Sequence, residues 1–359
     1  MITIIYPYRN RNLTRVENSF LSLKEQTSAN FKVKFVDYGS EIETAGKARL
    51  LCGRYSFIDY IYYYTQHQPW NKSRALNSVI KTLESGYCFV ADVDIIFHPE
   101  FIQKAIQLQD NERITYFQVG FLAEGVEVLE DHFTTGNFRK STWEATGLTM
   151  FPVKVLQELR GFDEFYHFWG AEDTDIHVRL KNAGYEVEFY DKDKEVLLLH
   201  QWHSSYRSKE KKILTRDLQI TGIVQLNHQH LQWAIENKTT ATNCEEWGVV
   251  MSKKDFEFLD QLKPDITLDN EKRKIDDLLY GQFPSFKNKF VKIEIKKSQY
   301  QRSLLYNLKR ILRKKVPEYY TLKEVNDLVL LHLISLYRNQ PYFYNIHKDL
   351  NGITIGIKF

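Results

Sequence analysis

The chain has 359 residues, of which 43% are hydrophobic, so it is long enough for two domains or for one large domain with an appendage. Its formal net charge of +3 is too small to indicate a nucleic-acid-binding protein. The three cysteines, Cys52, Cys88 and Cys244, lack the spacing of a metal site or a disulfide framework, which favours reduced thiols in the cytoplasm.

The first 200 residues alternate between strand and helix patterns. Apolar, β-prone stretches cover residues 2–6, 31–37, 57–63 and 87–91, and helical spacing covers residues 13–26, 73–84 and a segment that begins near Pro99. Because strands that alternate with helices form parallel sheets, we predict an α/β fold, a mostly parallel sheet with helices on both faces. The first strand begins almost at Met1, so we expect no signal peptide.

Two acids follow the apolar stretch at residues 87–91. Asp92 and Asp94 are two residues apart, which places their side chains on the same side of an extended chain. Two nearby carboxylates repel each other unless a cation neutralises them, and their oxygens suit Mg²⁺ or Mn²⁺ shared with substrate phosphates. A solvated surface loop would explain the same tripeptide, so its interpretation depends on the segments downstream.

A second polar segment begins with Trp169-Gly170 and continues with Glu172 and Asp173. A helix follows, so both acids fall in its first turn, where the helix dipole alone would favour them. The helix dipole does not explain the tryptophan and glycine that precede the two acids. A flat aromatic ring packs on a sugar face while a carboxylate accepts a hydroxyl proton, so the segment suits a sugar-binding site.

A third segment ends a predicted strand at residues 195–199. His200 and His203 follow it, and imidazole is a common metal ligand. Together with Asp94 they form a candidate Mn²⁺ site. A zinc site is the competing interpretation, but no cysteine supports it and a zinc hydrolase would lack a third ligand and a general base.

The C-terminal part has long helical patterns and few strand signals before its last residues. We place a domain boundary near residue 220, which gives a catalytic domain at 1–220 and a mainly helical extension at 221–359. Residues 298–315 predict an amphipathic helix with a basic face, which either packs on the catalytic domain or attaches the chain to an anionic membrane surface. Residues 322–337 are a candidate homodimer face. We expect a cytoplasmic protein. If residues 298–315 attach to a membrane, the protein would be peripheral at the inner face of that membrane.

The order Asp-Val-Asp, Trp-Gly-Ala-Glu-Asp and a late histidine resembles the GT-A glycosyltransferases, a Rossmann-like fold. The resemblance covers roughly residues 1–207 and is to the family 2 enzymes and to the β-1,4-galactosyltransferase and chondroitin-synthase group. The segment Thr146-Gly147-Leu148-Thr149-Met150-Phe151, then Gly161-Phe162-Asp163-Glu164, then residues 169–180 is similar to the galactosyltransferase C-terminal motif.

The resemblance implies a role for individual residues on the donor side. Pro7, Arg9 and Asn10 match the end of the first strand, which contacts the nucleotide, and Asp37 matches the acid that reads uracil. The segment that approaches uracil and diphosphate is matched by Asn71, Lys72 and Arg74.

The resemblance also implies roles at the metal and the transferred sugar. Asp94 matches the direct metal ligand and Asp92 the acid towards the ribose or the metal, while His203 and His200 match the metal-binding histidines. Trp169 and Gly170 match the sugar platform. Glu172 would bind sugar hydroxyls, and Asp173 would be the general base.

Three departures from the pattern are visible. Ala171 stands where a second glycine is usual, the segment Tyr8-Arg9-Asn10-Arg11 is more basic than the common one, and Asp37 is not followed by a second acid.

The resemblance implies an inverting enzyme that moves Gal, GalNAc or GlcNAc from a UDP-sugar to a saccharide or lipid-linked saccharide, with Mn²⁺ or Mg²⁺, in surface polysaccharide synthesis. The alternatives are a processive polysaccharide synthase domain and a non-catalytic sugar- or nucleotide-binding module of the same fold.

Overall fold

The computed structural model describes residues 1–126, 132–191, 195–204 and 212–359. The chain forms two compact units. Unit 1 comprises Met1–Gln66, Trp70–Ser208 and Val224–Val250, and unit 2 comprises His67–Pro69, Lys209–Ile223 and Met251–Phe359. The units are therefore not two consecutive stretches of sequence, because the chain returns to unit 1 after residue 223.

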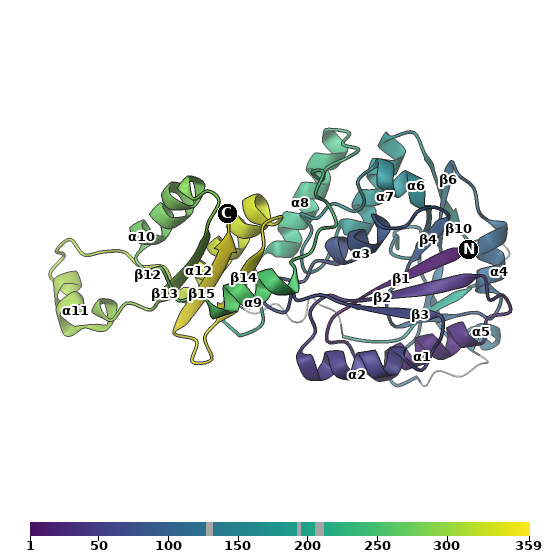
Figure 1. The fold of residues 1–359 in the computed structure, drawn as a ribbon, viewed down its shortest axis with the longest axis horizontal. Coiled ribbons are helices and arrows are strands. Elements are labelled where there is room, and N and C mark those ends of the chain that lie inside the picture. Colours follow the sequence, from purple (N-terminus) through teal and green to yellow (C-terminus); the bar gives the residue numbers. More distant parts are fainter. Residues whose placement is uncertain (127–131, 192–194, 205–211) are drawn as a thin grey trace. The chain divides into compact units, whose positions relative to one another are not determined.

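Unit 1 is built on a seven-stranded sheet with the order β10-β6-β9-β4-β1-β2-β3 (Figure 1). Its strands are β1 (Ile2–Tyr8), β2 (Phe31–Asp37), β3 (Ile58–Tyr62), β4 (Tyr87–Val90), β6 (Arg113–Phe117), β9 (Thr149–Pro152) and β10 (Glu186–Tyr190). The neighbours of β1 and β2 all run parallel, and β9 runs antiparallel to both β4 and β6. The predicted α/β class and mostly parallel sheet are confirmed.

Alternation along β1 explains the two layers of helices. Ile2, Ile4 and Tyr6 belong to one apolar core, and Ile5 belongs to another on the opposite face. The first core is shared with α1 and α4, and the second with α3, α6 and α7, which lie on the other side of the sheet (Figure 1). The helices of unit 1 are α1 (Leu13–Lys24), α2 (Ile42–Cys52), α3 (Lys72–Ile80), α4 (Phe101–Gln107), α5 (His132–Thr135), α6 (Val153–Glu158), α7 (Glu172–Asn182) and most of α8 (Ile223–Glu236).

A second sheet in unit 1 has the order β5-β11-β7-β8. Its strands are β5 (Ile95–Phe97), β7 (Val119–Phe121), β8 (Arg139–Lys140) and β11 (Leu198–His200). β11 pairs antiparallel with β5, and His200 lies opposite Ile95. This pairing brings the segment after residue 199 beside the Asp92-Val93-Asp94 turn.

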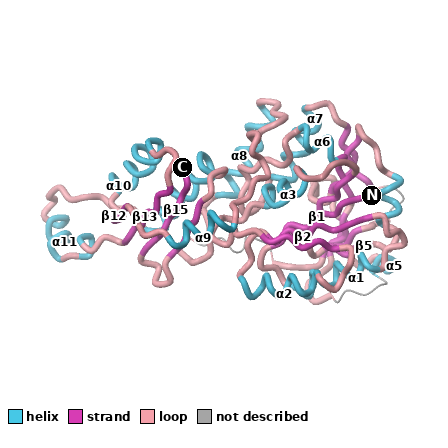
Figure 2. The backbone as a smooth tube through the Cα atoms, viewed as in Figure 1, coloured by secondary structure: helices cyan, strands magenta, loops and turns pink. Residues whose placement is uncertain are grey.

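Unit 2 contains a four-stranded sheet with the order β12-β13-β15-β14, visible as one group of magenta strands in Figure 2. The strands are β12 (Ile266–Asp269), β13 (Phe290–Lys296), β14 (Tyr342–Ile346) and β15 (Gly352–Lys358). The helices are α9 (Lys253–Gln261), α10 (Lys272–Asp276), α11 (Leu304–Ile311) and α12 (Leu322–His332), with short π-helical turns at Asp277–Gln282 and Leu333–Tyr337 and 3₁₀ turns at Phe283–Ser285 and Tyr300–Arg302. The expected helices are thus accompanied by a sheet, although strand character was expected only in the last residues.

Among the described residues, no helix combines the length and apolar character needed to cross a bilayer.

Candidate active site

Asp94, His200 and His203 come together where β5 and β11 pair. One possible ligand atom from each residue lies within 4.8 Å of the others. The Asp94 carboxylate is nearly buried, and its oxygens lie 3.7 Å from His200 Nε2 and 3.6 Å from His203 Nε2. These separations are too long for hydrogen bonds. The structure therefore assembles the three residues that the sequence predicted as metal ligands, from segments more than a hundred residues apart.

The ring orientation of His203 favours a cation at this place. The His203 Nδ1–H donates to the backbone carbonyl of Ser204 at 3.0 Å, so a neutral ring carries its lone pair on Nε2. That lone pair faces the Asp94 carboxylate. Two acceptors in this position repel each other unless a proton or a cation lies between them, and a backbone acceptor on the far nitrogen is typical of metal-bound histidines. The residues present fit a divalent cation.

Gln201, which lies between the two histidines in the sequence, holds their segment against Asp94. Its backbone N–H and its side-chain Nε2 each donate to the carbonyl of Asp94 at 3.1 Å. The same Nε2 donates to the carbonyl of Arg15 at 2.9 Å, while Asn18 Nδ2 donates to Gln201 Oε1 at 2.9 Å. Gln201 thus ties the candidate metal site to α1. Arg15 adds a guanidinium 3.8 Å from the Asp94 carboxylate.

Lys72 gathers three carboxylates at the junction of two helix N-termini. It is the first residue of α3, and its Nζ lies 3.5 Å from Asp92, 3.4 Å from Glu172 and 3.2 Å from Asp173. Glu172 and Asp173 open α7. Partial positive charge at both N-termini and the ammonium group stabilise acids that would otherwise repel one another. The predicted base therefore lies next to the Asp92-Val93-Asp94 turn.

The protonation behaviour of these groups follows from burial and mutual proximity. Burial raises the pKa of Asp173 to about 7, and Glu172 and Asp92 act in the same direction, while Lys72 opposes the change. Burial alone would lower the pKa of Lys72, but the three carboxylates raise it well above its usual range. Burial also disfavours charge on Asp92, yet Lys72 and the two histidines hold the pKa of Asp92 below its usual value. With this pKa, Asp173 changes protonation near neutral pH.

The loop before α7 has an unusual backbone. Phe168, Gly170 and Ala171 all have positive φ, at 67°, 99° and 73°. α8 supports this loop, since Asn227 Nδ2 donates to the carbonyl of Trp169 at 3.1 Å. Trp169 is 39% exposed, and its predicted role as a sugar platform stays a prediction.

The predicted donor residues at the ends of β1 and β2 form a tight corner. Pro7 is buried within β1, and Arg9 Nη2 donates to the carbonyl of Thr65 at 2.9 Å. Asn10 has φ 49°, and its Oδ1 accepts from the N–H of Glu41 at 3.0 Å. Fully buried Asp37 accepts hydrogen bonds from Ser40 N–H and Tyr60 Oη, both at 2.8 Å, and burial raises its pKa despite these bonds. Contacts of this corner with a nucleotide stay predictions.

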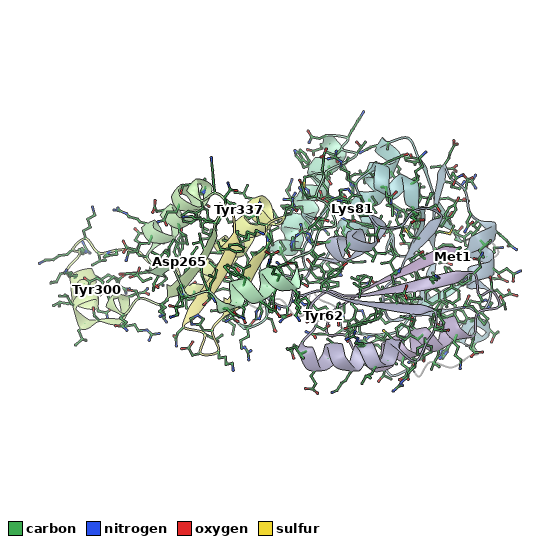
Figure 3. The ribbon with its side chains drawn as sticks, viewed as in Figure 1. Met1, Tyr62, Lys81, Asp265, Tyr300 and Tyr337 are labelled. Carbon is green, nitrogen blue, oxygen red and sulfur yellow. The ribbon has the colours of Figure 1, made fainter. Side chains whose placement is uncertain are left out.

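Asn71 and Arg74 belong to a buried network around Glu164. Asn71 caps α3 by accepting from Arg74 N–H at 2.8 Å, and its Nδ2 donates to the carbonyl of Glu164 at 2.9 Å. The Arg74 guanidinium binds Glu164 Oε2 through Nε at 2.8 Å and Nη2 at 2.7 Å. Glu164 Oε1 accepts from Asn77 Nδ2 at 3.0 Å and from Gly248 N–H at 2.6 Å. Lys81, labelled in Figure 3, ties the end of α3 to the same returning segment by donating to the carbonyl of Trp247 at 3.0 Å.

Arg15, Gln201 and Gly147 were not among the predicted site residues, although each lies beside one of them. A Cβ added at Gly147 would lie 3.1 Å from Asp173 Oδ2, so glycine keeps space beside the predicted base. The available signal for Gly147 was its position in the motif that begins at Thr146. For Gln201 the signal was its place between the two histidines. Arg15 had no local signal, because only the fold brings α1 to Asp94.

Comparison with known proteins identifies one matching family. Residues 132–203 match the family described as the N-terminal domain of galactosyltransferase, and this range contains Trp169, Asp173, His200 and His203. This match supports the interpretation of the chain as a glycosyltransferase. No curated protein matches the chain.

Among solved structures, the chain is similar to the crystal structure of GalNAc-T7 with UDP, GalNAc and Mn²⁺, with a TM-score of 0.43 and 13% sequence identity. The similarity covers 57% of this chain and 44% of that one, so the chain spans less than half the length of that protein.

Proposed function

We propose that this chain is a metal-dependent, inverting GT-A glycosyltransferase, which transfers a hexose or N-acetylhexosamine from a UDP-sugar to a hydroxyl of a saccharide acceptor. Gal, GalNAc and GlcNAc are the proposed sugars, and surface polysaccharide synthesis is the proposed setting. One observation carries the proposal. The candidate cation ligands Asp94, His200 and His203 lie beside a second cluster in which Lys72 contacts Asp92, Glu172 and Asp173.

The first cluster supports binding of the donor diphosphate. Asp94, His200 and His203 would hold Mn²⁺ or Mg²⁺, which when bound would stabilise the negative charge of the departing diphosphate. Asp92 would orient the ribose or contribute to the cation site. Lys72 adds a permanent positive charge, because the neighbouring acids keep its pKa well above the usual range.

The second cluster supports activation of the acceptor. Asp173 would take the proton from an acceptor hydroxyl as its oxygen bonds to the anomeric carbon. The bond between that carbon and the phosphate oxygen would break, and UDP would leave as the anion. A single displacement with one carboxylate base inverts the anomeric centre. A pKa of about 7 suits a base that works near neutral pH.

Neighbouring residues would hold the sugars. The half-exposed ring of Trp169 would pack on a hexose face, Gly170 would allow close approach, and Glu172 would accept a hydrogen bond from a sugar hydroxyl. Gly147 would leave room for the acceptor oxygen beside Asp173, since a methyl group there would press on the carboxylate.

The test is UDP release from a panel of UDP-sugars, with and without Mn²⁺, in wild type and Asp173→Asn. We expect metal-dependent turnover of one donor, reduced about 10²–10⁴-fold in the variant because it lacks a general base. Wild-type turnover in Asp173→Asn would refute the assignment of the base. A binding module would retain UDP affinity but release no UDP with any acceptor offered.

The pH profile provides a second readout for the same residue. Because Asp173 must be deprotonated to act as a base, the rate should fall about tenfold per pH unit below about 7 and level off above it. The residual activity of Asp173→Asn should lack this acidic limb. An unchanged limb in the variant would assign the titration to another group.

A further inference from the structure

The helix α11 of unit 2 leaves a complete apolar face exposed. It begins after Ser303, whose Oγ accepts from the N–H of Tyr306 at 3.1 Å, and it is followed by Arg313 with φ 53°. The helix is therefore shorter than the predicted range 298–315. Five aliphatic side chains in and just after it are each more than half exposed, and the first is 88% exposed: Leu304, Leu305, Leu308, Ile311 and Leu312.

The side of α11 opposite to these residues anchors the helix. At 100° per residue, the five aliphatic side chains form one stripe, and Tyr306 lies roughly opposite its centre. Tyr306 is buried, its ring centroid lies 5.7 Å from those of Tyr300 and Tyr319, and its hydroxyl donates to the carbonyl of Pro317 at 3.4 Å. Figure 3 marks Tyr300 beside this helix. Because Tyr306 holds the opposite side, the aliphatic stripe faces away from its contacts within unit 2.

Positive charge accompanies the stripe. Residues 298–317 contain no aspartate or glutamate and six basic residues: Arg302, Lys309, Arg310, Arg313, Lys314 and Lys315. All but Lys309 are exposed, and Lys309 Nζ lies 6.0 Å from the centroid of the Tyr300 ring. Basic side chains beside an aliphatic stripe are complementary to lipid headgroups above a hydrocarbon layer.

We infer that α11 and the residues that follow it bind the surface of an anionic bilayer, with the leucine and isoleucine side chains inserted below the headgroups. A nucleic acid would use the charges but leave the five aliphatic side chains in water. The inference does not depend on the proposed reaction, and its test reads lipid binding rather than turnover.

The experiment is flotation of the full chain with vesicles of phosphatidylcholine containing about one third phosphatidylglycerol, compared with pure phosphatidylcholine. We expect binding to the anionic vesicles only, weakened by salt. Replacing Arg310, Arg313, Lys314 and Lys315 together by Gln should weaken the binding more than about a hundredfold, since each basic side chain near an anionic surface contributes about fivefold. Leu308→Asp/Ile311→Asp should abolish binding without unfolding the chain, because both side chains are exposed.

Leu50→Asp is the matched control. Leu50 on α2 is 74% exposed, and this variant should bind the vesicles as wild type does. The inference is overturned by absent binding of wild type, by equal binding to neutral vesicles, or by undiminished binding of Leu308→Asp/Ile311→Asp. A dimer that dissociates in that double variant, with no vesicle binding by wild type, would identify a second copy of the chain as the occupant instead.

Discussion

Two polar clusters of unit 1 contain residues that sequence reasoning assigned to donor binding, but they differ in how their polar atoms are satisfied. The Glu164 carboxylate accepts hydrogen bonds of 2.6–3.0 Å from Arg74, Asn77 and Gly248 N–H, and the side chains of Glu164, Arg74 and Asn77 are buried. Around Asp94, the imidazoles of His200 and His203 stand 3.6–3.7 Å from the carboxylate.

The two clusters differ in whether their polar atoms are already paired within the protein. Short, mutually paired contacts in a buried place indicate a network that stabilises the fold. Ligand atoms that converge without hydrogen bonds to one another leave interactions for something that binds. Arg74 and Glu164 therefore hold α3 against the segment before α7. This packing places Lys72, at the start of α3, against the acids at the start of α7.

The comparison predicts its largest effect at Glu164. Glu164→Ala should lower the free energy of unfolding by about 3–5 kcal/mol, because Arg74 would be left buried without its carboxylate. Urea denaturation measures this change. Glu245→Ala is the control, since its side chain is 87% exposed and its ion pair with Arg160 spans 3.8 Å. The control should change stability by less than about 0.5 kcal/mol. Equal effects of the two substitutions would show that the Glu164 network is no more stabilising than a surface pair.

In contrast to Glu164→Ala, Asp94→Ala should weaken metal binding more than it destabilises the fold. We expect Mn²⁺ affinity to fall at least about a hundredfold, equivalent to about 2.7 kcal/mol, with little loss of stability. The reason is that the Asp94 carboxylate lies 3.6–3.8 Å from His200, His203 and Arg15, distances too long for hydrogen bonds. Calorimetric titration with Mn²⁺ and thermal unfolding measure the two quantities. Asp59→Ala, which removes a surface partner of Lys34, should leave Mn²⁺ binding intact. Undiminished Mn²⁺ binding by Asp94→Ala would exclude this cluster as the metal site.

Much of unit 1 could be predicted from local pattern. The strands at 31–37 and 87–91 and the helices beginning near residues 13 and 172 agree with β2, β4, α1 and α7. These segments carry their own period of hydrophobicity, and Asn12 caps the N-terminus of α1. In contrast, the role of Arg74 in the fold depends on Glu164, which is 90 residues away, and no local signal reports such a partner.

The sheet of unit 2 was harder to predict, because β12 is short and three of the seven residues of β13 are charged. β13 reads Phe-Val-Lys-Ile-Glu-Ile-Lys, and the alternation of apolar and charged residues was a usable strand signal. β12 has only four residues, and its pairing with β13 sets its structure. The amphipathic pattern near α11 was visible in the sequence, but the exposure of its aliphatic stripe follows from the placement of Tyr306 on the packed side.

The smallest predicted effect concerns the two ends of α7. Ala171 before the helix and Gly184 after it both have positive φ, at 73° and 92°. A residue with a Cβ is strained at positive φ. This strain explains why glycine would suit the position that Ala171 occupies in this chain. Ala171→Gly should therefore raise the free energy of unfolding by about 0.5–1 kcal/mol, once the greater freedom of the unfolded glycine is subtracted. Gly184→Ala should lower it by about 1 kcal/mol through the backbone alone, because a Cβ there meets no atom within 4 Å. Urea denaturation of both variants measures the pair. Two changes of the same sign would mean that the loop beside Trp169 does not hold Ala171 in a strained conformation, and that this edge of the site is set by side-chain contacts instead.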